Sequence, residues 1–171
     1  METWDAIRAR RNVREFSPDP IPAEALDRIL EAGWRSPSSK NEQRWDFVLC
    51  TERGQLQELS KAWIYGKHVA GSAATLVLLA PDVAEPGVRE SIQYDLGQVS
   101  LSVMLAAADL GIGSCHSAVG DQELVRQLLG HPVDRFAAVM ISLGYPADRP
   151  LKPIKNPNRR PFEDVVHRGR W

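Results

Sequence analysis

A long helix is expected from about Val88 to Leu110, directly after the Pro86-Gly87 pair. From Leu96 onward, apolar and small residues occupy nearly every face of this helix. A helix that is apolar all round has to be buried on all sides. A chain of 171 residues forms one domain of ordinary size around a single core. The segment therefore predicts a central buried helix, one side of which a partner subunit could cover.

Two continuous apolar runs predict strands that are buried on both faces. They cover Thr75–Ala80 and Phe136–Leu143, and a third strand is expected at Asp46–Thr51. Shorter amphipathic helices are expected between them. These are a first helix capped by Thr3 and running to about Arg10, a second from Pro22 to Gly33, a third carrying Leu56, Leu59 and Trp63, and a fourth from Asp121 to Gly130. The irregular alternation of helices and strands favours a layered α+β fold.

The last part of the chain is rich in proline, at positions 146, 150, 153, 157 and 161. Proline can neither continue a helix nor donate to a strand ladder, so an extended tail is expected. An extended tail cannot bury itself and must lie along its own domain or along a partner. The expected organisation is a single domain over residues 1–171, with residues from about 147 to 171 as an extended arm.

Composition excludes several classes of protein. The formal net charge is −1, which argues against a nucleic-acid binder. Two cysteines without Cys-x-x-Cys spacing indicate no disulfide framework, and four histidines show no metal-ligand spacing. No apolar stretch is long enough to span a bilayer, and the N-terminus does not resemble a signal peptide. A soluble, cytoplasmic protein without a bound metal is expected.

Arginines cluster at both ends of the chain. Arg10, Arg11 and Arg14 surround Asn12 at the end of the first helix, and Arg159-Arg160 follows the proline-rich tail. Guanidinium groups match the geometry of phosphate oxygens, and an anion would relieve the repulsion among them. Short arginine clusters are also common on solvated surfaces, so each cluster alone is compatible with a simple basic surface.

The segment Ser36–Gln43 is a polar loop dense in amides and hydroxyls. Such groups both donate and accept hydrogen bonds, which suits the edge of a flat heteroaromatic ring. A generic polar loop would have a similar composition.

Five motifs in order resemble the nitroreductase family of FMN-dependent oxidoreductases. They are Arg10-Arg11-x-x-Arg14-x-Phe16; Pro37-Ser38-Ser39-x-Asn41-x-Gln43-x-Trp45-x-Phe47; Asp95-Leu96-Gly97, leading through the long helix to Gly111-Ile112-Gly113-Ser114-Cys115; Leu143-Gly144-Tyr145-Pro146; and Arg159-Arg160-Pro161-Phe162-Glu163-Asp164-Val165-Val166-His167. Together they cover essentially the whole chain.

The resemblance implies a three-layer sandwich with a mostly antiparallel sheet, and a homodimer that exchanges its C-terminal arms. It implies FMN at the dimer interface as the cofactor. By position, the resemblance assigns one set of residues to the phosphate and ribityl chain and a second set to the flavin ring. The first set is Arg10, Arg11, Asn12, Arg14, Arg159 and Arg160; the second is Pro37, Ser38, Ser39 and Asn41 from the other subunit, with backbone near Ala118 and Val119.

The implied activity is ping-pong hydride transfer from NAD(P)H through FMN to nitroaromatics, quinones or enones. The stretch His116–Val119 departs from the family pattern, and His116 is a candidate substrate contact because its ordinary pKa lies near neutrality. Alternatives within flavin enzymes are flavin breakdown, reductive dehalogenation and dehydrogenation. The alternative outside enzymes is an anion- or RNA-binding module that uses the two basic ends.

Overall fold

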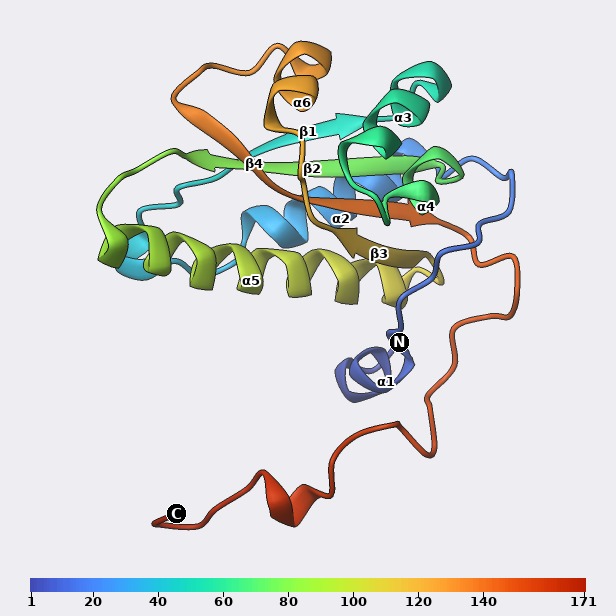
Figure 1. Cartoon of the computed structure of the whole chain (residues 1–171). Helices are drawn as coiled ribbons and strands as arrows, with labels where there is room; N and C mark the ends of the chain where they lie inside the picture. The colour runs from blue at the N-terminus through green and yellow to red at the C-terminus, as the bar shows by residue number, and fades with distance from the viewer.

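The computed structural model describes all 171 residues and contains one four-stranded antiparallel sheet with strand order β1-β2-β4-β3. Helices cover both faces of this sheet (Figure 1). The strands are β1 (Asp46–Cys50), β2 (Ala74–Pro81), β3 (Gly113–Ser117) and β4 (Arg135–Gly144). The helices are α1 (Thr3–Ala9), α2 (Ala23–Trp34), α3 (Arg53–Leu59), α4 (Lys67–Ala70), α5 (Pro86–Asp109) and α6 (Gln122–Leu129), with short 3₁₀ turns at Ser39–Asn41, Ser60–Ala62 and Phe162–Asp164.

Strand β2 contributes side chains to two hydrophobic cores, one on each face of the sheet. Leu76, Leu78 and Ala80 face α2 and α5, whereas Val77 and Leu79 face α3 and α6. Successive side chains in a strand point to opposite faces, so a strand covered on both sides has to be apolar throughout. The predicted three-layer α+β sandwich with an antiparallel sheet is confirmed.

Helix α5 is buried on one side only in the single chain. Val99, Val103 and Ala107 are fully buried against the sheet and α2, but Tyr94 is 73% exposed and Leu101 is 51% exposed. The single chain therefore covers only part of this helix, and cover of the open side by a partner subunit stays a prediction. The domain has no element that covers the face of α5 with Tyr94 and Leu101.

The predicted helix ends are confirmed for α6 but not for α1 and α3. Helix α6 is capped as expected: Asp121 Oδ1 accepts a hydrogen bond from the Leu124 N–H at 2.9 Å, and Gly130 ends the helix with a φ of 67°. Thr3 does not cap α1, since it is the first helical residue. Trp63 lies outside α3, because a 3₁₀ turn follows Leu59 and the backbone at Trp63 is extended.

Strand β3 and helix α4 were not anticipated from the sequence. The β3 sequence, Gly-Ser-Cys-His-Ser, has neither an apolar run nor a clear alternation. It becomes a strand because it pairs along its whole length with β4, with Cys115 opposite Ser142. Helix α4 is a single turn of four residues, too short to show a helical period.

The segment that follows α1 crosses the end of the sheet beside β3. The Val13 N–H donates to the Ser114 carbonyl at 2.9 Å, and the Ser17 N–H donates to the Tyr145 carbonyl at 2.8 Å. A Cβ atom at Gly113 would lie 2.7 Å from Val13 Cγ2. Glycine is therefore required at this position, because any Cβ atom would overlap with the Val13 side chain.

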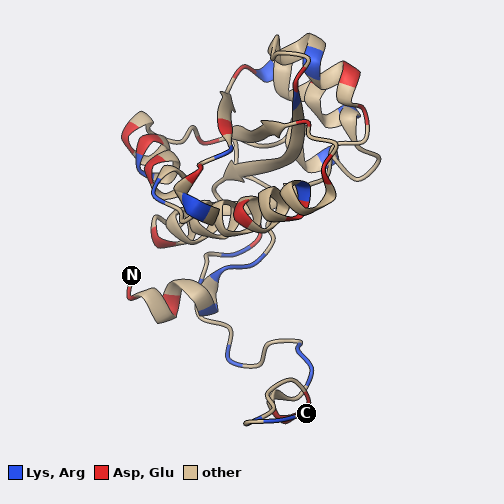
Figure 2. Ribbon diagram, turned by 90° about the vertical axis from the view of Figure 1, so that its left-hand side faces the viewer, with Lys and Arg blue, Asp and Glu red and all other residues tan.

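The C-terminal tail is extended, as the prolines predict. Its first residues lie against the N-terminal segment, where the Ile154 N–H donates to the Arg8 carbonyl at 3.0 Å. The rest of the tail runs away from the body of the domain, with basic residues spaced along it (Figures 1 and 2). Residues from 155 to 171 are exposed throughout, and the tail's single short turn is Phe162–Asp164. The tail thus lies on no surface of its own chain beyond its first few residues.

Candidate functional site

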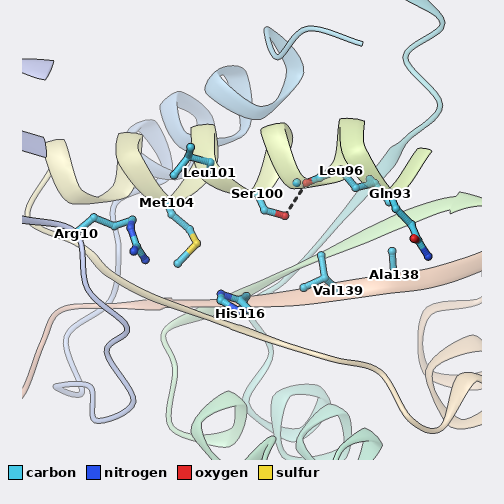
Figure 3. Close-up of a pocket in the computed structure, with 10 residues that line it drawn as sticks. Arg10, Gln93, Leu96, Ser100, Leu101, Met104, His116, Ala138 and Val139 are labelled. Atoms are coloured by element: carbon cyan, nitrogen blue, oxygen red, sulfur yellow. Dashed lines mark hydrogen bonds between the residues drawn. The ribbon is translucent and has the colours of Figure 1, made fainter. Parts of the chain in front are cut away.

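Arg10, Asn12 and Arg14 project from the segment that crosses the sheet end. Arg10 lines a cavity of about 460 Å³ between one face of α5 and the strands β3 and β4. Met104 and Leu101 of α5 lie on one side of this cavity, and His116 of β3 lies on the other (Figure 3). Arg14 lines two neighbouring cavities, one of which it shares with Asn12.

Neither Arg10 nor Arg14 has a carboxylate within 4 Å or a side-chain hydrogen bond. Arg11 differs, because its Nη2 atom lies 2.7 Å from Asp148 Oδ1 and also donates to the Arg149 carbonyl. Hydrogen bonds from Arg11 and from the Arg149 backbone hold the pKa of Asp148 below its usual range. Arg11 thus anchors the base of the tail, whereas Arg10 and Arg14 are free to bind an anion.

Asn12 carries the clearest sign of a ligand. Its Oδ1 atom is buried and has no hydrogen-bond partner. An unsatisfied buried polar atom costs about 1–3 kcal/mol. A ligand hydroxyl donating to Asn12 Oδ1, next to an anion held by Arg10 and Arg14, would remove that cost. A polyol phosphate has both groups.

The loop Ser36–Gln43 is strained and fixed in place. Lys40, Asn41 and Gln43 have φ values of 52°, 56° and 50°, which are unfavourable for residues with side chains. The Ser39 N–H donates to both carboxylate oxygens of Asp95 at 3.1 Å. Asp95 is a buried residue of α5. Asp95 was not predicted to anchor this loop, although it begins the Asp95-Leu96-Gly97 motif.

In one chain this loop and Arg10 lie at different places along α5. The loop is tied to Asp95, and Arg10 faces Met104, nine residues further on. At 1.5 Å per residue the separation along the helix axis is roughly 14 Å. Pro37, Ser38, Ser39 and Asn41 therefore do not join the arginine cluster within a single chain.

Arg159 and Arg160 are also apart from the cluster, because they lie on the exposed tail (Figure 1). Their recorded hydrogen bonds are local: Arg159 Nη1 donates to the Asn158 carbonyl, and Arg160 Nη2 donates to the Asp164 carbonyl. Their roles remain predictions that a single chain does not test.

Ala118 and Val119 form the turn that follows β3. The Ser117 hydroxyl donates to the Ala118 carbonyl at 3.2 Å, and the next two N–H groups, of Gly120 and Asp121, both donate to the Ala62 carbonyl. The turn is thus fixed to the segment after α3. His116, just before the turn, is exposed and lies across the cavity from α5, within the same cavity as Arg10 (Figure 3).

His68 of α4 lies close enough to Arg14 and His116 for their charges to affect it. It is buried, and its Nδ1 atom lies 2.8 Å from Ser142 Oγ. Burial lowers the pKa of His68, and the positive charges of Arg14 and His116 lower it further. The segment after α3 comes near Arg14 only through the tertiary fold.

Both cysteines are buried free thiols. Burial raises the pKa of Cys50 to about 11, and it raises the pKa of Cys115 against the opposing effect of Arg14. The burial of Cys115 agrees with its interpretation as a buried thiol rather than a nucleophile. The structure contains no cluster of His, Cys, Asp and Glu residues that could hold a metal ion, and none of its helices is both long and apolar enough to cross a membrane.

The lowered pKa of His68 makes stability depend on pH. In the unfolded chain this histidine titrates at its ordinary value near 6.5, whereas in the folded chain its pKa is lower. Below pH 6.5 the unfolded state therefore binds more protons, and the stability contributed by neutral His68 is lost as pH falls towards the folded pKa. The slope is at most about 1.4 kcal/mol per pH unit for one group.

We expect the melting temperature of the wild-type protein to fall more steeply between pH 7.5 and pH 5.5 than that of His68→Gln. His131→Gln, which replaces another buried histidine, is the matched control. Circular dichroism melts at several pH values give the three slopes. A His68→Gln slope equal to that of the wild type would contradict the prediction.

Solved structures with the same fold include proteins named as flavin-dependent oxidoreductases. The FMN-dependent nitroreductase of Clostridium difficile superposes with a TM-score of 0.83 at 22% identity, covering 95% of this chain and 97% of that one. The NADPH:FMN oxidoreductase of Vibrio harveyi, solved in complex with NAD⁺, gives a TM-score of 0.83 at 27% identity and covers 97% and 76%. These likenesses show a fold that this chain shares with named flavin oxidoreductases.

The family follows from the sequence comparisons. The Nitroreductase family profile matches residues 7–66 and 55–145. A protein of Archaeoglobus fulgidus, provisionally named NADH dehydrogenase/NAD(P)H nitroreductase, is 31% identical over 174 residues, which cover 99% of both chains. This chain belongs to the nitroreductase family, and the prediction made from its motif order is confirmed.

Proposed function

We propose that this protein binds FMN and catalyses ping-pong transfer of hydride from NAD(P)H to small electrophilic acceptors such as nitroaromatics, quinones and enones. The observation that carries the proposal is the set of polar groups without partners on one short segment: the guanidinium groups of Arg10 and Arg14, and the buried Oδ1 atom of Asn12. The names of the Clostridium and Vibrio relatives support FMN and a nicotinamide as the ligands.

The residues fit the phosphate end of FMN. Arg10 and Arg14 would bind the phosphate, and Asn12 Oδ1 would accept from a ribityl hydroxyl. Arg159, with Arg160, would complete the phosphate site from the tail. Arg11 would join them only by giving up its ion pair with Asp148.

The ring end of the site requires a homodimer. Four large apolar side chains on the face of α1 and α5 are exposed in one chain: Trp4, Ile7, Tyr94 and Leu101. Exposed apolar surface of this kind is typical of a protein–protein interface. A two-fold arrangement would bring Pro37, Ser38, Ser39 and Asn41 of one subunit towards the arginines of the other, and would exchange the C-terminal arms. Backbone near Ala118 and Val119 would face the flavin ring.

When bound, FMN would supply the hydride-transfer chemistry between the nicotinamide and the acceptor. The protein's residues hold and orient the reactants. The face of α5 around Met104 and Leu101 excludes water from one side of the 460 Å³ cavity. The imidazole of His116 lies in the same cavity and can contact a substrate or donate a proton to it, and solvent can deliver the proton where His116 does not.

The test begins with the purified protein. We expect it to be yellow and dimeric with about one FMN per subunit, and we expect NADH or NADPH to bleach the flavin absorbance in the absence of oxygen. A nitroaromatic or a quinone added afterwards should restore the absorbance. Colourless protein with no affinity for added FMN would end the proposal. Steeply salt-dependent binding of RNA by such a protein would favour the binding-module alternative.

A further inference from the structure

A separate cavity, of about 400 Å³, lies where the C-terminal tail begins. We call it the tail-base cavity. Its lining includes four cations, Arg11, Arg149, Lys152 and Lys155, and no acidic residue. Its volume lies within the range of about 300–1,000 Å³ that is usual for small-molecule sites.

The positive charge of the tail-base cavity does not depend on the residues assigned to the FMN phosphate. Arg11 pairs with Asp148 at 2.7 Å, and Arg149 Nε lies 4.0 Å from the same carboxylate. Lys152 and Lys155 form no ion pair. Four cations against one carboxylate leave a clear positive excess. Three of the four cations would remain even if Arg11 turned to the cofactor.

The backbone that carries these cations is held in place within one chain. The Ile154 N–H donates to the Arg8 carbonyl at 3.0 Å, and Arg11 Nη2 donates to a carbonyl at the start of the tail at 2.9 Å. Pro150 and Pro153 also line the cavity, and each proline ring fixes its own backbone φ. A ligand would therefore order mainly the side chains, which lowers the entropic cost of binding.

The residue types of the tail-base cavity suit a nucleotide phosphate. A phosphate monoester carries about two negative charges near neutral pH and offers three acceptor oxygens. Lysine binds phosphate as a point charge, and the fork of Arg149 can donate to two of its oxygens. A carboxylate carries one charge and would leave more of the excess uncompensated. Pro150, Pro153 and Ile154 add an apolar surface beside the cations, which suits the sugar or base attached to the phosphate.

From these observations we infer that the tail-base cavity binds the phosphate monoester group of a nucleotide, separately from the cofactor phosphate. Arg149, Lys152 and Lys155 would bind the phosphate oxygens, and Pro150 with Ile154 would contact the attached nucleoside. Two sources supply this chemistry: the 2′-phosphate of NADPH, and a free nucleoside monophosphate. The inference goes beyond the proposed function, because binding at this cavity requires no hydride transfer.

The test measures binding to the purified protein by isothermal titration calorimetry. The probes are adenosine 2′-monophosphate, adenosine 5′-monophosphate and adenosine, which lacks the phosphate. We expect a monophosphate to bind more tightly than adenosine, and we expect Lys152→Gln/Lys155→Gln to reduce that preference by about 5- to 30-fold, the range for two exposed charge-assisted contacts. Lys152→Arg/Lys155→Arg should retain the preference. Arg168→Gln/Arg170→Gln is the matched control, because it removes the same charge from the same tail outside the cavity.

The KM values for NADH and NADPH distinguish the two sources of the phosphate. If NADPH is the ligand, adenosine 2′-monophosphate binds more tightly than its 5′ isomer, and the lysine-to-glutamine double variant loses the wild-type preference for NADPH. If a free nucleotide is the ligand, the 5′ isomer binds at least as tightly, and the same variant leaves the ratio of the two KM values unchanged.

Equal affinity of the wild type for adenosine and for both monophosphates would overturn the inference. An equal loss of monophosphate affinity in the Arg168→Gln/Arg170→Gln control would also overturn it, because the tail would then act only through its overall charge. Release of FMN from Lys152→Gln/Lys155→Gln would do the same, because the cavity would then hold the cofactor. Lysine-dependent binding of a monophosphate in a protein that NADH and NADPH do not reduce would support the cavity and refute the proposed function.

Discussion

The double variant Arg10→Ala/Arg14→Ala is expected to bind FMN at least about 100-fold more weakly than the wild type. Each charge-assisted contact to phosphate contributes about 1.5–3 kcal/mol, so losing two should cost about 3–6 kcal/mol. Neither arginine has an acidic partner in the folded chain. Their removal therefore breaks no ion pair within the protein, and the melting temperature of the flavin-free protein should change little.

Fluorescence titration of FMN measures the affinity, and circular dichroism measures the stability of the flavin-free protein. Arg8→Ala is the matched control, because Arg8 lies in the last turn of α1, two residues before Arg10, and its partner, Asp5, is half-buried. The single variants Arg10→Ala and Arg14→Ala show whether the two contributions add. Undiminished FMN affinity in the double variant would rule out the phosphate role of both residues.

Truncation before Pro153 is expected to weaken the dimer by at least about 100-fold and to release FMN. The lost segment exposes Phe162, Val165, Val166 and Trp171 in the single chain. Each apolar side chain that becomes fully buried on a partner contributes about 1.5–3 kcal/mol, and even two of them give a factor of this size. Truncation also removes Arg159 and Arg160, the tail's part of the proposed phosphate site.

The truncated protein keeps Arg11, Asp148 and the sheet, so its domain should still fold. Light scattering after size-exclusion chromatography measures the oligomer, and the ratio of flavin to protein absorbance measures the cofactor. Phe162→Ser/Val166→Ser tests the apolar contacts alone, and Arg159→Ala/Arg160→Ala tests the phosphate contacts alone. A truncated protein that stays dimeric and yellow would show that the tail has neither role.

Local pattern was enough to predict much of the fold. The apolar run at Thr75–Ala80 reports a strand covered on both faces, because the two-residue period of a strand needs apolar residues on each side. Asp121 caps the start of α6 and Gly130 ends it, each through contacts within a few residues. The proline spacing keeps the tail extended, since proline acts on its own backbone. The family was predictable because five ordered motifs span nearly the whole chain.

Long-range pairing decided the rest. Strand β3 forms because it pairs with β4, and no pattern within Gly113–Ser117 predicts a strand. The sequence placed Arg10, Arg11 and Arg14 in one cluster, but the tail reaches back and pairs only Arg11 with Asp148. The strained loop is fixed by Asp95, 56 residues away, and His68 is brought near Arg14 by the packing of α4 on the sheet.

For the central helix α5, sequence and tertiary structure each decided a different property. Its composition by itself determined that α5 is long and needs cover on most of its surface, because each exposed apolar side chain costs free energy in water. Only the tertiary structure decided which face the domain covers and which face, with Tyr94 and Leu101, it leaves open. That choice depends on the arrangement of α2 and the sheet around the helix, and helical periodicity carries no signal for it in a helix that is apolar on every side.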